Sequence, residues 1–407
     1  MVHCFRFTEP TCHMKLRCHP SDFCVDERNS LSVGRSGSFA VYRLKKSGWT
    51  TLDVLQKLAR DLKINRRRIH HAGLKDRHAE TSQVITIEHG PQRDFDFESF
   101  AISYQGQAQR AVTAHDIEGN VFSLVMRSVT ENERLQAEKS LPVVQATGLT
   151  NYFDDQRFGS FIPGHSFIAE HWIRREYERA LWLMFAEPRA EDGRDERQQR
   201  EILRTHWNQW SQCKQELERS HRRSIVTFLD DRPGDFKGAW ERVNADLRGL
   251  CLSAFQSYLW NAIVDGLIRE RLPDESRREI QIVTGALACP DLVEKQMMGD
   301  LSELEIPLPS ARLLKQTIND PNVLEMVQTG VEKLGWQLEA IKVQTPRDRF
   351  FSRGLRALTV PVNDLTWSFS DDDLFENRDK LELKFTLPKG SYATMLIKQI
   401  MPSVDPD

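Results

Sequence analysis

The stretch SFAVYRLKKSGWTTLDVLQKLARDLKI, residues 38–64, changes from a strand pattern to a helix pattern near its middle. Its first part, SFAVYRLKK, has the period-two alternation of a strand. Its second part has the periodicity of an amphipathic helix, and Thr51 or Asp53 can cap the start. The apolar stripe of this predicted helix consists of Leu52, Leu55, Leu58 and Leu62.

Strand patterns follow this stretch and return at the end of the chain. QVITIE (83–88) and LTVPV (358–362) are typical of strands, and EGNVFSLVMRSV (118–129) predicts a Gly-Asn turn that leads into another strand. KLELKFTLP (380–388) predicts a half-buried antiparallel strand, because its apolar positions alternate with polar ones. Its apolar positions are Leu381, Leu383, Phe385 and Leu387.

From about residue 171 to residue 335 the pattern is helical, with AEPRAEDGRDERQQ (186–199) as an expected exposed loop. Helices placed between β-rich ends predict an α+β fold in which one domain is interrupted by another.

Composition limits the class of protein. The 407 residues are 40% hydrophobic and 28% charged, values typical of a folded globular protein. No apolar run approaches the ~20 residues needed to cross a bilayer, and the start lacks the ~7–15-residue apolar core of a signal peptide. We therefore expect a cytoplasmic protein with no membrane partner.

Seven cysteines, an odd number, do not indicate a disulfide framework. Four of them cluster near the N-terminus together with three histidines, but their spacings are longer and less regular than those of structural zinc sites. We therefore expect no metal. The cluster consists of Cys4, Cys12, Cys18 and Cys24 with His3, His13 and His19.

The stretch HHAGLKDRHAETSQ, residues 70–83, follows INRRR and surrounds its one aspartate, Asp76, with cations. A charge run is usually a solvated face, and the formal net charge of −3 argues against indiscriminate coating of nucleic acid. A local basic surface for RNA or DNA remains the alternative. A carboxylate among Lys75, Arg77, Arg67 and Arg68 should stay ionised, as a nucleophile must.

The stretch NYFDDQRFG, residues 151–159, sets two aromatic rings beside amides and an arginine. Such a pair of rings is commonly part of a core. Together with a basic loop around an aspartate, it also suits a flipped base that stacks on a ring and is oriented by an amide.

These stretches resemble the TruD family of pseudouridine synthases. AGLKDRHAETSQ matches the family pattern A-G-x-K-D-x-x-A-x-T-x-Q, and NYFDDQRFG matches N-Y-F-G-x-Q-R-F-G. HPSDFCVDE, LSAFQSYLWN and LPKGSYAT support the match, and the segments run in family order from about residue 17 to residue 400. The resemblance implies the pseudouridine synthase fold, a mixed and largely antiparallel sheet with helices. It implies a catalytic domain at 1–176 and 359–407, interrupted by an α-rich insertion domain at 177–358.

The resemblance also implies site residues. Asp76 would be the catalytic aspartate, and RNA would lie between the two domains. The substrate would be tRNA, with uridine 13 as the target, and neither a cofactor nor a protein partner is implied. The residues that would bind the target uridine are Phe23, Asn151, Phe153, Tyr392, Arg17, Lys75 and Glu27, with Phe153 as the ring that stacks on the base. Because three adjacent cations suit a phosphate track better than a base edge, we expect RNA backbone contacts at Arg66, Arg67 and Arg68.

The chain departs from the family at some positions. Asp154 replaces the usual glycine after NYF, and Tyr392 stands where bacterial relatives often have phenylalanine. Two other functions stay open: an RNA-binding or tRNA-folding protein whose catalysis is lost or secondary, and a metal-dependent nucleic-acid hydrolase. The sequence has no second well-placed carboxylate cluster beside Asp76, and this lack argues against the hydrolase.

Overall fold

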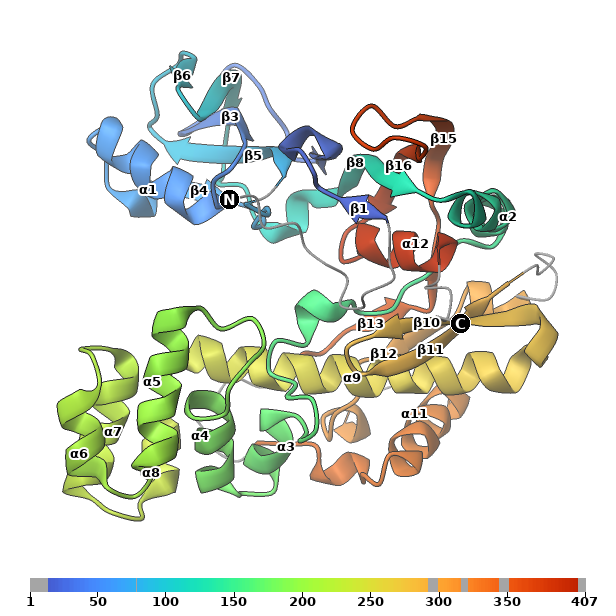
Figure 1. Cartoon of the computed structure of the whole chain (residues 1–407). Coiled ribbons are helices and arrows are strands. Elements are labelled where there is room, and N and C mark those ends of the chain that lie inside the picture. The colour runs from blue at the N-terminus through green and yellow to red at the C-terminus, as the bar shows by residue number, and fades with distance from the viewer. Residues whose placement is uncertain (1–13, 78, 292–298, 316–320, 344–350, 402–407) are drawn as a thin grey trace. The chain divides into compact units, whose positions relative to one another are not determined.

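The computed structural model describes residues 14–77, 79–291, 299–315, 321–343 and 351–401 (Figure 1). The chain divides into two compact units. The first contains residues 1–151, 290–302 and 359–407, and the second contains residues 152–289 and 303–358. Compact units and an inserted sequence domain need not share boundaries, so the expected insertion at 177–358 stays a proposal.

A mixed sheet organises the first unit, and ten strands belong to it within the described residues. Its strand order is β15-β16-β8-β2-β5-β3-β7-β6, while β1 also pairs with β8 and β4 with β5. The pairing of β2 with β5 is parallel, and the other strand pairings of this sheet among the described residues are antiparallel. The strands are β1 (Lys15–Leu16), β2 (Phe23–Asn29), β3 (Phe39–Lys46), β4 (Ile69–His71), β5 (Glu80–Glu88), β6 (Phe95–Phe97), β7 (Phe100–Ala108), β8 (Ile117–Val129), β15 (Asn363–Asp371) and β16 (Asp379–Pro388).

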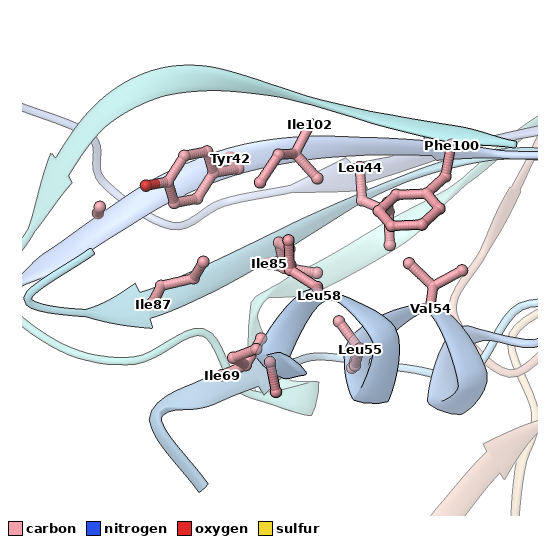
Figure 2. Packing of buried hydrophobic residues seen from close by; sticks show 12 residues of the cluster. Tyr42, Leu44, Val54, Leu55, Leu58, Ile69, Ile85, Ile87, Phe100 and Ile102 are labelled. Atoms are coloured by element: carbon pink, nitrogen blue, oxygen red, sulfur yellow. The ribbon is translucent and has the colours of Figure 1, made fainter. Parts of the chain in front are cut away.

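The stretch that opens the sequence analysis forms β3 and helix α1 (Thr51–Asp61), as predicted. The expected cap at Thr51 or Asp53 is wrong: Thr50 caps the helix, because its side chain accepts a hydrogen bond from the Asp53 backbone N–H. Figure 2 shows Val54, Leu55 and Leu58 packed against side chains of β3, β5 and β7. This core holds α1 against one face of the sheet.

The predicted apolar stripe of α1 is wrong at Leu52, whose side chain is 50% exposed. At about 100° per residue, position 52 lies far around the helix from the direction shared by positions 54, 55 and 58. Val54, which is fully buried, belongs to the stripe in its place.

The C-terminal strand prediction is confirmed by β16, which pairs antiparallel with both β15 and β8. Its four alternating apolar residues are buried, and Thr386 between them is buried as well. The Thr386 hydroxyl donates to Asp364 Oδ2 at 3.2 Å. Helix α12 (Ala393–Ile400) packs against α2 (Glu131–Thr147) in the same unit.

The predicted Gly-Asn turn is wrong, because Gly119 and Asn120 lie inside β8. A Cβ at Gly119 would lie 2.4 Å from the Leu387 carbonyl oxygen of β16. The glycine therefore serves close approach of two paired strands and not chain reversal.

The second unit is mainly helical. Its long helix α9 (Ala245–Arg271) is buried through most of its length, and the other helices pack in the same unit. Its other α-helices within the described ranges are α3 (Ile168–Ile173), α4 (Tyr177–Phe185), α5 (Arg194–Thr205), α6 (Trp210–Glu216), α7 (His221–Asp231), α8 (Phe236–Arg242) and α11 (Pro321–Lys333).

Strands also occur in the segment that was expected to be helical. A hairpin of β10 (Arg277–Ile282) and β11 (Gly285–Pro290) follows α9, and β12 (Glu305–Pro307) pairs with β13 (Leu355–Ala357). The expected loop at 186–199 ends early, because α5 begins at Arg194. The α+β class is nevertheless confirmed.

Candidate active site

Asp76 lies on the loop between β4 and β5, and side chains from two elements hold that loop. The Lys75 backbone N–H donates to Thr51 Oγ1 of α1 at 2.9 Å, and Gln83 Nε2 of β5 donates to the Gly73 carbonyl at 3.0 Å. The Thr51 hydroxyl donates to Gln83 Oε1 at 3.0 Å, which joins the two anchors. The side chain of Asp76 is 52% exposed, so a fixed loop presents a solvent-accessible carboxylate.

Arg17 provides a cation for this carboxylate. Its Nη2 donates to Asp76 Oδ2 at 3.2 Å, and its guanidinium carbon lies 4.0 Å from the ring centroid of Phe23. The Arg17 side chain is only 10% exposed. The ring of Phe23 thus holds the Arg17 cation against the Asp76 carboxylate. The structure therefore brings together three residues that were predicted from the sequence: Arg17, Phe23 and Asp76.

Lys75 and Glu27 form a buried ion pair beside Asp76. Lys75 Nζ lies 3.1 Å from Glu27 Oε2, and it also donates to Asn120 Oδ1 at 2.6 Å. Glu27 Oε1 accepts the Val84 backbone N–H at 3.3 Å. The Glu27 side chain is fully buried and that of Lys75 is 9% exposed. The two residues therefore tie the Asp76 loop to β2, β5 and β8.

Asn151 and Tyr392 belong to the same unit as Asp76. Asn151 is buried and follows the short strand β9 (Leu149–Thr150), which pairs with β14 (Thr359–Val360). Gln399 of α12 clamps this strand, since its amide accepts the Thr150 N–H at 3.1 Å and donates to the Thr150 carbonyl at 2.8 Å. Tyr392 is half-buried and is the residue before α12.

Phe153 belongs to the second unit. Its backbone N–H donates to Asn261 Oδ1 at 2.9 Å, and its carbonyl accepts from Asn261 Nδ2 at 2.8 Å. Its ring lies 4.0 Å from the Arg356 guanidinium carbon and makes an edge contact with Trp260 at 5.6 Å. Two residues of the LSAFQSYLWN segment thus hold Phe153. Asp154 beside it is buried as well.

The three adjacent arginines form the 3-10 turn η2 (Arg66–Arg68) and differ in their surroundings. Arg66 Nη1 donates to the Ile69 carbonyl at 2.7 Å, and burial lowers the pKa of Arg66. Arg68 donates to the Glu88 carbonyl at 3.0 Å, whereas Arg67 is exposed.

Arg68 and the Asp76 loop lie at opposite ends of β5. Arg68 binds Glu88, the last residue of the strand, whereas the loop leads into Glu80, the first residue. At about 3.3 Å per residue, the strand separates its two ends by roughly 25 Å. The structure therefore does not bring Arg68 to Asp76.

Two polar residues of this site were missed at the level of sequence. Lys46 Nζ donates to the carbonyl of Asp76 at 2.7 Å, and Asn120 binds Lys75. Lys46 shares a strand face with Tyr42 and Leu44. A lysine on an otherwise apolar strand face is the sequence feature that could have identified it. Asn120 was missed because the sequence pattern was interpreted as a turn.

Within the described part of the chain, no group of three or more His, Cys, Asp or Glu side chains could hold a metal ion. Cys4, Cys12, His3 and His13 lie outside the described residues, so the expectation of no metal stays a prediction. No helix among the described residues is long and apolar enough to cross a membrane.

The family model of tRNA pseudouridine synthase D (TruD) matches residues 2–400. The "Probable tRNA pseudouridine synthase D 1" of Methanococcus maripaludis is 27% identical over 403 residues, which are 95% of this chain and 99% of the relative. The tRNA pseudouridine synthase D of Aquifex aeolicus is 26% identical, and the match covers 96% of this chain and 98% of the relative.

The crystal structure of a Methanosarcina mazei protein, named as a candidate tRNA pseudouridine synthase D (TruD), superposes with a TM-score of 0.70. The match covers 95% of this chain and 93% of that one at 23% identity, and this likeness shows the fold alone. Because the family model extends over nearly all of the sequence, the chain belongs to the TruD family of tRNA pseudouridine synthases, which are isomerases.

Proposed function

We propose that this protein converts the uridine at position 13 of tRNA to pseudouridine, with Asp76 as the catalytic residue. The observation that carries the proposal is the Asp76 carboxylate, which is half-exposed, lies on a tethered loop and is 3.2 Å from Arg17. A nucleophile or base needs to be both accessible and ionised.

The reaction breaks the N1–C1′ bond of uridine, rotates the uracil and joins C5 to C1′. Asp76 can serve by attack at C1′, by attack at C6 or by removal of the C2′ proton, and each route uses the same anionic oxygen. Buried polar groups and rings would hold the extruded base during its rotation. We assign this role to Phe23, Asn151, Tyr392 and Phe153, with the last as the stacking ring.

Lys75 and Glu27 would act on the substrate through the position of the Asp76 loop, because they bind each other in the described structure. Arg17 would orient the Asp76 carboxylate, to which it donates at 3.2 Å. Among the three arginines of η2, Arg67 is the exposed one and is the best candidate for a phosphate contact, whereas Arg66 and Arg68 bind backbone carbonyls. We further propose that the protein acts in the cytoplasm, where tRNA is modified.

The first test replaces Asp76 by Asn and measures tritium release from tRNA that carries 5-tritiated uridine. Joining C5 to C1′ expels the hydrogen at C5, so tritium release reports the isomerisation itself. We expect the parent to release tritium, and we expect Asp76→Asn to lose at least a hundredfold in single-turnover rate. The affinity for tRNA should change little, because the amide keeps the shape of the carboxylate.

Substitution of uridine 13 by cytidine in the tRNA tests the position. Loss of all release would support uridine 13, and full release from the substituted tRNA would contradict it. A parent protein that binds tRNA tightly but releases no tritium would favour the alternative function, an RNA-binding or tRNA-folding protein.

A further inference from the structure

Lys46 is a buried lysine immediately behind the proposed catalytic residue. It is the last residue of β3 and is 4% exposed. In the sheet it lies opposite Thr81 of β5 and Phe100 of β7, neither of which is charged. Its neighbour Lys45 points to the other face of the strand and is exposed. A lysine at such a position is uncommon, because a buried ammonium must be compensated.

Two backbone carbonyls compensate the Lys46 ammonium. Nζ donates to the carbonyl of Asp76 at 2.7 Å and to the carbonyl of Trp49 at 2.9 Å. Lys46 therefore joins the segment before α1 to the catalytic loop. The contact on the loop is made with Asp76 itself, and the carbonyl group that is held belongs to the same residue as the reactive carboxylate.

The contacts of Lys46 differ in kind from the other contacts of the loop. Thr51 binds the backbone of Lys75 and Gln83 binds that of Gly73, and these side chains are neutral. Lys46 adds a positive charge on the buried side of Asp76, whereas Arg17 reaches the carboxylate itself.

We propose that Lys46 is a positioning residue for the isomerisation: its ammonium holds the backbone carbonyl of Asp76 and so fixes the residue that carries the reactive carboxylate. The inference rests on the proposed role of Asp76. It adds to that role a residue that touches neither the base nor the reacting atoms.

The protonation of Lys46 gives the inference a second consequence. Burial lowers the pKa of Lys46 to about 8, and the charge of Lys75 lowers it as well, while the Asp76 carboxylate acts in the opposite direction. Both of these charges lie on the Asp76 loop, and among the described residues Asp26, Glu80 and Asp96 line the same pocket as Lys46. Below pH 8 the ammonium form prevails, so the positioning should weaken as the pH rises through about 8.

The test compares Lys46→Met with the matched control Lys45→Met, which removes the adjacent, exposed ammonium. Single-turnover tritium release from saturating tRNA measures the chemical step, and a separate titration measures tRNA affinity. We expect Lys46→Met to lose at least tenfold in rate with less than a threefold change in affinity. Lys45→Met should keep its rate within about twofold of the parent, and Lys46→Arg should recover part of the loss.

The pH profile tests whether the charged form of Lys46 is required for the rate. The parent and Lys45→Met should lose rate as the pH rises from 7 to 9, and Lys46→Met should lack that decline. A folded Lys46→Met with the parental rate, or with a loss confined to affinity, would overturn the inference. If Lys46→Met does not fold, a parental profile that is flat from pH 7 to 9 would overturn it equally.

Asp76→Asn measured in the same assay keeps the two proposals distinct. Activity in Asp76→Asn would refute the role of Asp76. An inactive Asp76→Asn beside a fully active Lys46→Met would refute only the role of Lys46.

Discussion

At the scale of single residues, the site contains a buried ion pair whose two charges stabilise each other. Lys75 and Glu27 are 3.1 Å apart and nearly inaccessible, so each is tolerated only because the other is present. We predict that Lys75→Met costs about 3–5 kcal/mol of unfolding free energy, because a buried Glu27 carboxylate loses its cation. Urea unfolding monitored by circular dichroism measures the loss. The double variant Lys75→Met/Glu27→Gln should recover much of it, and a double variant no more stable than the single one would contradict this account. Lys45→Met serves as the control for removal of an exposed lysine.

At the scale of elements, the close approach of the paired strands β8 and β16 limits the side chain that position 119 can carry. Gly119 lies opposite Pro388 in the register, and a Cβ there would lie 2.4 Å from the Leu387 carbonyl oxygen. We predict that Gly119→Ala destabilises the protein by about 1–3 kcal/mol, the usual cost of forcing extra atoms into a packed site. Since Asn120 follows directly and binds Lys75, the rate of tritium release should fall with the stability. Gly34→Ala is the matched control, because nothing lies within 4 Å of its added Cβ. Equal midpoints of denaturation for the two variants would show that the approach of the strands is not the constraint.

At the scale of the whole molecule, the C-terminal strands β15 and β16 complete the sheet of the first unit beside β8. β16 covers β8 along most of its length and carries four buried apolar residues, and α12 supplies the Gln399 clamp on the strand before Asn151. We predict that truncation after Leu358 abolishes tritium release and removes the cooperative unfolding of the first unit, because β8 would become an open edge beside an exposed core. The helical signal of the second unit should largely persist, because its described residues end at Leu358. A chain ending at Met401 is the control and should behave like the parent. A truncated protein that still modifies tRNA would show that the C-terminal strands are dispensable.

Local patterns in the sequence were sufficient to predict β3, α1, β5 and β16, because alternation and helical periodicity are properties of neighbouring residues. The α+β class followed from their order along the chain. The choice of Asp76 depended on the motif around it and on the family resemblance, and its role stays a proposal.

The contacts between distant segments were decided only in the folded chain. The approach of β8 to β16 made Gly119 a strand residue, and the burial of Lys46 against the Asp76 carbonyl joined residues 30 positions apart. The same is true of the Glu27–Lys75 pair and of the distance between Arg68 and the Asp76 loop. A local pattern shows which side of its own strand or helix a residue occupies. Which other segment faces that side is set by burial and backbone pairing over the whole sheet, and only the tertiary structure determines it.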